Sequence, residues 1–514
     1  MRALILSLRL LLAGLMAVSA PAAIHVQAVH AQAIAAPAFS RPALSGPDDG
    51  ETIARSGFRA EDVGYVLFDL DSGAPVAARQ ADRPFAPASV AKLPTVAAAL
   101  AILGPEHRFE TSLHITGTLR DGVLDGDLVL KGGGDPSLAT EGLMELAADL
   151  RVLGITRVAG RYLFDASALP ELPEIDSGQP WTAGYNTGVG ALSVNFNRFQ
   201  LSWTARAGQP VQASAWSVSD AGRVPLDSVA VEIAAPVVET REALTVTPVS
   251  TTGGSTKEGE RWRLAPRPGA ASSVWLPVTQ PGIAAAQVFR RVAADAGIAL
   301  PAPAPGTVPP SATLAALHRS EPLGVLARHV LRYSNNLSAE LIGLAAARRL
   351  DPQAATLAQS AAVLSAAVLS ALPMAALPMA ALPKTDWTGW HLLNHSGLNT
   401  ASRVTPAQMA AVLRAAGPEV WDLLPGEDEG KALPRGVRAK SGTLAYAKAL
   451  AGTLTTAGGR RLGFAVFVTD EGRRRAMDAA MDRRVAEIPP EARAWLARAR
   501  TLQADLLALW IAQS

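Results

Sequence analysis

The pattern of apolar and polar positions predicts strands followed by a buried helix in the first part of the chain. Apolar positions at 64–70 and 75–79, separated by Asp-Ser-Gly, predict two short strands joined by a turn. A nearly continuous apolar run begins near Ser89 and ends at Gly104, which predicts a helix that is buried on all sides. Pro94 lies within this run, where it removes one backbone donor.

Residues 109–278 have a different sequence pattern, in which short apolar segments alternate with segments rich in Gly, Ser and Pro. This pattern predicts a β-rich insertion that contains one helix at 141–153. Helical periodicity returns afterwards, and the predicted helices are 282–296, 323–332, 338–349, 406–416 and 491–510. Before the last helix, apolar segments predict adjacent antiparallel strands at 437–440, 449–454 and 462–469.

Composition is that of a folded protein with more than one domain. The chain has 514 residues, of which 49% are apolar and 18% charged, so two or three domains are expected. The net charge is +2 and no basic stripe is interleaved with aromatic residues, which argues against nucleic-acid binding. Residues 353–383 form a low-complexity Ala/Leu/Pro tract, which predicts a helix followed by a linker.

The first 33 residues have the pattern of a secretory signal peptide. Arg2 and Arg9 accompany an apolar stretch at 10–20, and small residues at 29–33 offer cleavage sites. The stretch is short for a membrane-spanning helix, so we favour export and removal over the alternative of a retained anchor. The absence of cysteine is compatible with an exported protein that has no disulfides. No stable membrane anchor is expected in the mature chain.

Ser89 and Lys92 are the first candidate reactive pair. Side chains three residues apart share one face of a helix, so the Ser89 hydroxyl and the Lys92 amine can converge. A serine needs a base to become a nucleophile, and a desolvated lysine can serve, whereas an arginine stays charged. Alone, this Ser-x-x-Lys spacing is weak, because it also fits a solvated lysine on an ordinary helix.

Two later stretches strengthen this pair. Ser334 and Asn336 form a Ser-x-Asn element where a helix is predicted to begin, and residues 440–443 read Lys-Ser-Gly-Thr at the end of a predicted strand. Penicillin-binding proteins and β-lactamases share three such elements in this order. We expect Ser89 to attack a carbonyl, Lys92 to accept its proton and Ser334 to pass a proton to the leaving amine. Asn336 is expected to hold Lys92 and the substrate backbone.

The Lys-Ser-Gly-Thr element is predicted to bind substrate. Lys440, Ser441 and Thr443 form a cationic, hydroxyl-lined site that suits a carboxylate. Gly442 lets an extended peptide approach the strand edge. The backbone N–H groups of Ser89 and Thr443 are the predicted oxyanion hole.

From about residue 60 onward, the chain resembles the class C low-molecular-mass penicillin-binding proteins, the D-alanyl-D-alanine carboxypeptidase/endopeptidase family. Further similar stretches lie at 126–138, 191–195, 396–398 and 403–406. The resemblance implies an α/β fold, with a β-lactamase/transpeptidase-like domain whose antiparallel sheet is flanked by helices. That domain is expected at 45–108 and 279–514, interrupted by two nested β-rich domains at 109–278.

The resemblance also implies a serine DD-peptidase that cleaves the D-alanyl-D-alanine bond of peptidoglycan stem peptides in the periplasm. β-Lactam antibiotics would acylate its serine, and no cofactor or metal would be needed. Two departures concern the pocket for the diaminopimelate side chain. The family usually has an aspartate two residues after the tryptophan, where this chain has Ala183 after Trp181. It also has an arginine where this chain has Thr400.

Other interpretations remain open on the sequence alone. The same scaffold could be a β-lactamase or esterase, or a catalytically weak protein that only binds peptidoglycan. His391 and His395 lie four residues apart, a spacing that could suit a metal, but no acidic third ligand stands nearby. We expect turn and surface roles for these two histidines.

Overall fold

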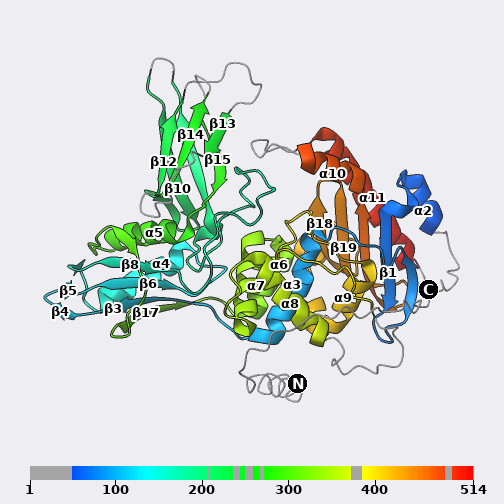
Figure 1. Cartoon of the computed structure of the whole chain (residues 1–514), viewed down its shortest axis with the longest axis horizontal. Coiled ribbons are helices and arrows are strands. Elements are labelled where there is room, and N and C mark those ends of the chain that lie inside the picture. The colour runs from blue at the N-terminus through cyan, green and yellow to red at the C-terminus, as the bar shows by residue number, and fades with distance from the viewer. Residues whose placement is uncertain are drawn as a thin grey trace, which may run out of the picture. The chain divides into compact units, whose positions relative to one another are not determined.

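A five-stranded antiparallel sheet with the order β18-β19-β20-β1-β2 organises the first and last parts of the chain (Figure 1). Its strands are β1 (Val63–Asp69), β2 (Pro75–Arg79), β18 (Val437–Leu444), β19 (Ala447–Thr455) and β20 (Arg461–Thr469). Strand β1 pairs with β20, from Val63 opposite Val468 to Asp69 opposite Leu462. The predicted antiparallel strands near the C-terminus are confirmed, and they close the sheet onto the first strand of the chain.

Alternation along β1 places helices on both faces of this sheet. Tyr65 and Leu67 pack with Trp510 of α11 (Pro490–Ile511) in one buried cluster. Val66 and Phe68 point to the opposite face and pack in the cluster that includes helices α3 (Lys92–Leu103) and α9 (Pro406–Trp421). The short helix α2 (Asp49–Ser56) lies against α11 (Figure 1).

Helix α3 follows a 3₁₀ turn at Ala88–Ala91. Eight of its twelve residues are buried, as the apolar run predicted. Pro94 lies in the first turn, the part of a helix that tolerates proline best. The other helices beside it are α6 (Leu323–Tyr333), α7 (Asn336–Leu350) and α8 (Leu357–Ala371), and α10 (Glu471–Ala480) follows β20.

The described residues of the β-rich insertion form four sheets, with the orders β16-β8-β6-β3-β17, β11-β10-β9-β15, β12-β14-β13 and β4-β5-β7. Their strands are β3 (Glu110–Ile115), β4 (Thr118–Arg120), β5 (Val123–Asp125), β6 (Leu128–Gly132), β7 (Arg157–Val158), β8 (Tyr162–Asp165), β9 (Arg198–Thr204), β10 (Gln212–Ser219), β11 (Gly222–Pro225), β12 (Val229–Ile233), β13 (Leu244–Pro248), β14 (Glu260–Pro266), β15 (Ala271–Pro277), β16 (Pro303–Pro305) and β17 (Thr313–Arg319). Helices α4 (Thr140–Val152) and α5 (Pro281–Asp295) pack against each other among these sheets.

The predicted end of the insertion at residue 278 is too early. Strand β17 pairs with β3, β16 pairs with β8, and α5 contributes Phe289 to the buried cluster of the insertion. The helical periodicity of 282–296 suggested a return to the first domain. Strands β17 and β3 are distant in sequence, so the local pattern of apolar and polar residues could not predict that they pair.

The computed structural model describes residues 49–206, 209–234, 244–248, 259–266, 271–371, 385–480 and 489–512. The predicted signal peptide at 1–33 and the later part of the Ala/Leu/Pro tract lie outside these residues. The part of the tract that is described contains α8, in agreement with the predicted helix. In the described part of the chain, no helix combines the length and the apolar character needed to cross a bilayer.

Candidate active site

Ser89 and Lys92 lie together where the 3₁₀ turn enters α3. The Ser89 Oγ and Lys92 Nζ atoms are 3.0 Å apart, and Lys92 is completely buried while Ser89 is half-buried. Lys92 Nζ also donates to Asn336 Oδ1 and to the Ser396 carbonyl oxygen, each at 2.8 Å. A neutral amine has two protons for these two acceptors, and its lone pair then faces the serine hydroxyl.

Burial controls the charge of this lysine. Desolvation lowers the pKa of Lys92 to about 7, and the nearby Glu340 carboxylate opposes that shift. Near pH 7, Lys92 is therefore neutral in a large fraction of the molecules. This is the protonation state that a general base requires.

Glu340 fixes the loop to which Lys92 is bonded. Its two carboxylate oxygens accept the backbone N–H groups of Ser396 at 2.8 Å and His395 at 2.9 Å. Burial raises the pKa of Glu340, while these N–H groups and Lys92 lower it. The sequence analysis missed Glu340, although two signals were present. It is an acidic residue inside the apolar run at 337–344, and it lies one helical turn after Asn336.

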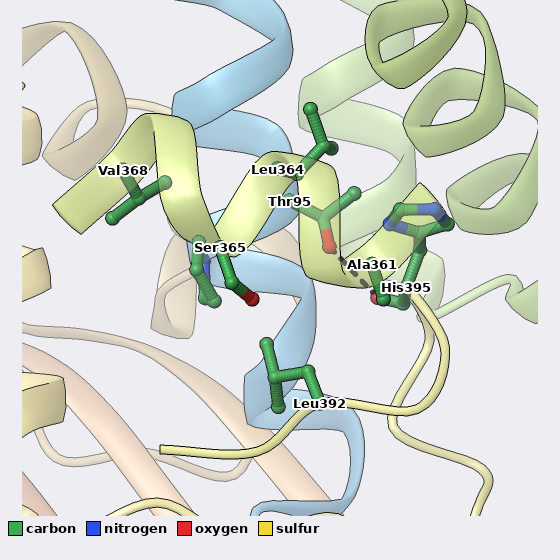
Figure 2. A pocket seen from close by; sticks show the side chains of 8 residues that line it. Thr95, Ala361, Leu364, Ser365, Val368, Leu392 and His395 are labelled. Atoms are coloured by element: carbon green, nitrogen blue, oxygen red, sulfur yellow. Dashed lines mark hydrogen bonds between the residues drawn. The ribbon is translucent and has the colours of Figure 1, made fainter. Parts of the chain in front are cut away.

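His395 is buried, so the expectation of a surface role for it is wrong. Its Nε2 lies 2.8 Å from Ser360 Oγ, and its carbonyl oxygen accepts the Thr95 hydroxyl at 3.0 Å, the bond that Figure 2 shows. A Cβ on Gly343 would overlap the imidazole ring, so the close approach of α7 allows only glycine there. Burial lowers the pKa of His395 to about 3.

The space beside this histidine is very small. Pro94, Thr95, His395 and residues of α8 line a cavity of about 10 Å³, as Figure 2 shows for most of them. That volume is close to the least that can hold one water molecule. His391, by contrast, is exposed and its backbone pairs with Arg403. Among the residues that the structure describes, no group of three or more His, Cys, Asp or Glu residues could hold a metal ion.

Ser334 and Lys440 form a second bonded pair. Lys440 Nζ donates to Ser334 Oγ and to the Ser441 carbonyl oxygen, each at 2.8 Å. Ser334 caps α6 in a left-handed conformation with φ 58°, between α6 and α7. Burial lowers the pKa of Lys440 well below its usual value, and the positive charge of Lys92 adds to that effect.

Gly442 brings strand β18 against the turn that carries Ser89. A Cβ on Gly442 would lie 2.7 Å from the Pro87 carbonyl oxygen and 3.0 Å from the Ser89 backbone nitrogen. Strand β18 is the end strand of its sheet, and the exposed residues Ser441 and Thr443 alternate with the buried Lys440 and Gly442. The structure therefore brings all three sequence elements together around Ser89.

Lys448 is a further residue that the sequence analysis missed. It lies opposite Thr443 on the neighbouring strand β19, and its Nζ donates to Thr443 Oγ1 at 2.6 Å. Burial and the nearby Arg500 lower the pKa of Lys448 to about 8. The cross-strand position could have been found only with the register of β18 and β19 known.

The two loops that depart from the resembled family also meet. Gln179 Nε2 donates to the Leu398 carbonyl oxygen at 3.2 Å, which joins the loop of Ala183 to the loop of Thr400. The carbonyl oxygen of Thr400 accepts a bond from Arg403 at 2.7 Å. Arg403 in turn forms an ion pair with Glu471 at 2.7 Å.

Comparison with known protein families shows the family to which the chain belongs. Residues 51–488 match the model of the D-Ala-D-Ala carboxypeptidase 3 (S13) family. The chain belongs to this family. The match covers both parts of the domain that carries Ser89 and also the insertion, so the expected family resemblance is confirmed.

Individual relatives share shorter segments. The chain is 29% identical over 142 residues to the D-alanyl-D-alanine carboxypeptidase DacB of Haemophilus influenzae. It is 33% identical over 134 residues to a D-alanyl-D-alanine carboxypeptidase of Actinomadura sp. strain R39. These segments cover 27% and 26% of this chain, and 29% and 25% of the two relatives.

A solved structure extends the similarity to the whole fold. Penicillin-binding protein 4 of Haemophilus influenzae superposes with a TM-score of 0.70 at 21% identity. The match covers 90% of this chain and 99% of that one. The predicted fold class, a transpeptidase-like α/β domain with a large β-rich insertion, is confirmed.

Proposed function

We propose that the chain is a serine DD-peptidase that cleaves the D-alanyl-D-alanine bond of peptidoglycan stem peptides through an acyl-enzyme on Ser89. The observation that carries this proposal is the contact of Ser89 Oγ with the buried Lys92 amine at 3.0 Å. Membership in the D-Ala-D-Ala carboxypeptidase 3 (S13) family supports the proposed substrate class.

Acylation begins with the transfer of the Ser89 proton to the neutral Lys92 amine. The Ser89 oxygen forms a bond to the carbonyl carbon, and the backbone N–H groups of Ser89 and Thr443 hold the oxyanion. The C–N bond then breaks, and Ser334 delivers a proton to the leaving amine. Ser334 regains a proton from Lys440, whose Nζ donates to Ser334 Oγ at 2.8 Å. Lys92 then releases the proton that it took from Ser89 to solvent, and Lys440 regains one from solvent. A water molecule afterwards hydrolyses the ester, with the neutral Lys92 amine as its base.

The substrate lies along the open edge of β18. Its terminal carboxylate is bound by Lys440 and by the hydroxyls of Ser441 and Thr443. Lys448 donates to Thr443 Oγ1, which leaves the Thr443 hydroxyl proton free to point at that carboxylate. Asn336 Oδ1 holds Lys92, and its amide nitrogen donates to the Tyr185 carbonyl oxygen at 3.1 Å.

β-Lactams are expected to acylate the same serine. The Haemophilus influenzae penicillin-binding protein 4, which shares the fold, has been solved in complex with a β-lactam. For this chain we further propose export through the signal peptide at 1–33, action in the periplasm, and a catalytic domain formed by residues on both sides of an insertion at about 109–319.

The proposal is tested by incubating the protein with labelled penicillin and isolating the adduct. We expect a stable adduct on Ser89 in the unaltered protein and in Ser272→Ala, which changes an exposed serine of β15. Ser89→Ala should carry no label. Rapid turnover of the antibiotic without an adduct would indicate a β-lactamase instead. A protein that binds muropeptides but shows neither adduct nor cleavage would be a binding protein.

A further inference from the structure

The sheet β11-β10-β9-β15 of the insertion has one buried face and one face towards solvent. Along β9, Phe199, Leu201 and Trp203 are buried in the core of the insertion. Because side chains alternate along a strand, Arg198 and Gln200 point to the other side of the sheet, which we call the open face. The register of β9 with its neighbours then determines which other side chains share the open face.

Two tryptophans lie in one row across the open face. Trp216 of β10 and Trp275 of β15 are both opposite Gln200 of β9, one on each side of it, and Pro225 of β11 extends the row beyond Trp216. The backbones of the two tryptophans are therefore two strand spacings, about 9–10 Å, apart. Trp275 is 42% exposed and Trp216 is half-buried. Large apolar side chains that line up on a surface in this way indicate a binding site.

Hydroxyl groups form the next row of the open face. Ser214, Ser202 and Ser273 are in register across β10, β9 and β15. Trp216 Nε1 donates to Ser202 Oγ at 2.9 Å, and Gln200 Nε2 donates to Ser273 Oγ at 3.3 Å. The indole ring and the amide are thus held in place by the adjacent row. The open face combines aromatic surface with hydroxyl and amide groups on one rigid sheet.

A chain of sugars has the chemistry that complements this face. The two sides of a pyranose ring carry C–H groups that pack against aromatic rings, while its edges carry hydroxyls that need hydrogen-bond partners. Sheet faces bind oligosaccharides in other folds. No Leu, Ile, Met or Phe points outward from the described residues of these four strands. A protein partner would therefore bury little apolar surface beyond the two indole rings.

Arg198 connects the open face with the candidate active site. Its guanidinium lies over the ring of Trp275, 5.5 Å from the ring centroid. Arg198 also lines a cavity of about 520 Å³ whose lining includes Ser334 and Asn336. None of the outward residues that the structure describes on these four strands is acidic, so the face does not repel the carboxylates of stem peptides.

We propose that the open face binds the glycan strand of peptidoglycan, the polymer of N-acetylated sugars to which the stem peptides are attached. The identity of the polymer rests on the proposed DD-peptidase function. No bond is made or broken at this face. A stem peptide at Ser89 stays joined to its glycan, so a sugar site that adjoins the candidate active site raises the local concentration of the other stem peptides on that strand.

The test measures the binding of glycan strands from which an amidase has removed the stem peptides. Isothermal titration calorimetry gives Kd for the unaltered protein and for Trp216→Ala and Trp275→Ala. We expect each substitution to raise Kd about tenfold. The control Trp387→Ala changes a half-buried tryptophan of the catalytic domain and should bind like the unaltered protein. Charge is the same in all four proteins, so binding driven by charge alone would not distinguish them.

A second measurement separates binding from folding. The rate of acylation by penicillin and kcat/KM for a pentapeptide without sugars should be unchanged in Trp216→Ala and Trp275→Ala. KM for polymeric peptidoglycan should rise in both variants, because only the polymer contacts the open face. Equal losses of acylation and of glycan binding in both variants would show that the tryptophans act on the fold, and would overturn the sugar site.

The remaining outcomes distinguish this inference from the proposed function. If the unaltered protein did not bind the glycan, or if the tryptophan variants bound it equally well, the sugar site would be overturned and the DD-peptidase would stand. Loss of self-association in the variants with unchanged glycan binding would assign the face to a contact between copies and would also overturn the proposal. Glycan binding that depends on both tryptophans, in a protein that forms no adduct and cleaves no peptide, would support the sugar site and overturn the DD-peptidase.

Discussion

Lys92 and Glu340 are bonded to opposite ends of one residue, Ser396. Lys92 Nζ donates to its carbonyl oxygen and Glu340 Oε1 accepts its N–H, both at 2.8 Å. Because the Ser396 backbone is bonded at both its N–H and its carbonyl oxygen, the carboxylate fixes the loop that holds the lysine, and its charge acts on the lysine from close by. Glu340 is therefore a positioning residue for the proposed base.

Replacing Glu340 should shift the pH dependence of acylation. The carboxylate stabilises the charged form of Lys92, so its removal in Glu340→Gln lowers the pKa of Lys92 below its value of about 7. The neutral base is then available at lower pH, and the acidic limb of the rate of penicillin acylation moves to lower pH. The maximal rate should also fall, because a glutamine oxygen and amide cannot both accept the two N–H groups.

The control for that experiment is Glu145→Gln, which changes a carboxylate that is 69% exposed. Its acylation profile should match that of the unaltered protein. If Glu340→Gln lowered the rate equally at every pH, Glu340 would have only a structural role.

The proposed base should not tolerate arginine. In Lys92→Arg the guanidinium can still donate to Asn336 and Ser396, but it stays charged and accepts no proton from Ser89. We expect acylation to slow by about 10²–10⁴-fold, the usual contribution of a general base. Stopped-flow or quench measurements with penicillin provide the rate, and Lys131→Arg serves as the matched control. Near-normal acylation by Lys92→Arg would assign the base to another group.

Gly442 should be irreplaceable for activity. An alanine Cβ would lie 2.7 Å from the Pro87 carbonyl oxygen and 3.0 Å from the Ser89 nitrogen, so β18 must move away from Ser89. A displacement of about 1 Å in an active site can cost about 10²-fold in rate, and we expect a loss of that size for Gly442→Ala. Gly324→Ala is the control, because its Cβ would have ordinary contacts of 3.6 Å or more. Full activity in Gly442→Ala would show that β18 is not held against Ser89 in the working enzyme.

His395 should make the fold sensitive to acid. Burial lowers its pKa to about 3 in the folded state, whereas the unfolded chain binds this proton near pH 6.5. The stabilising contribution is therefore present above pH 6.5 and is lost as the pH falls from there toward 3. His395→Gln removes this titration. Its difference in unfolding free energy from the unaltered protein should shrink by up to about 1.4 kcal/mol per pH unit below 6.5.

Urea unfolding at pH 7, 6 and 5 measures this difference, and a constant value across the three would contradict the assignment. His391→Gln is the matched control, since His391 is exposed. This variant controls for the general effect of replacing a histidine by glutamine.

Local patterns were sufficient to predict most elements of the catalytic domain. The apolar run after Ser89, the antiparallel strands at the end of the chain and the amphipathic last helix all correspond to observed elements. Their periodicity arises from burial on one face or on all faces, and both are visible in sequence. The three spaced motifs predicted that Ser89, Ser334 and Lys440 would lie together, because the chemistry of acyl transfer needs those groups in one place.

Contacts between distant segments were not visible in the sequence. The assignment of β17 to the insertion depends on pairing with β3, and the burial of His395 depends on the absence of a side chain at Gly343. Glu340 reads as an ordinary helical residue until the loop at 395–396 is placed beside it. Each of these features is defined by a partner more than fifty residues away, and no local pattern specifies the partner.

Strand β1 is held between β2, its neighbour along the chain, and β20, which is made near the end of synthesis. A growing polypeptide consequently contains Ser89, the proposed nucleophile, long before the sheet beside it is complete, since such long-range pairing forms late in folding. An incomplete chain contains Ser89 and Lys92 but lacks the strand that faces them. The site that we propose is therefore complete only once the last part of the chain has been made and has paired with β1.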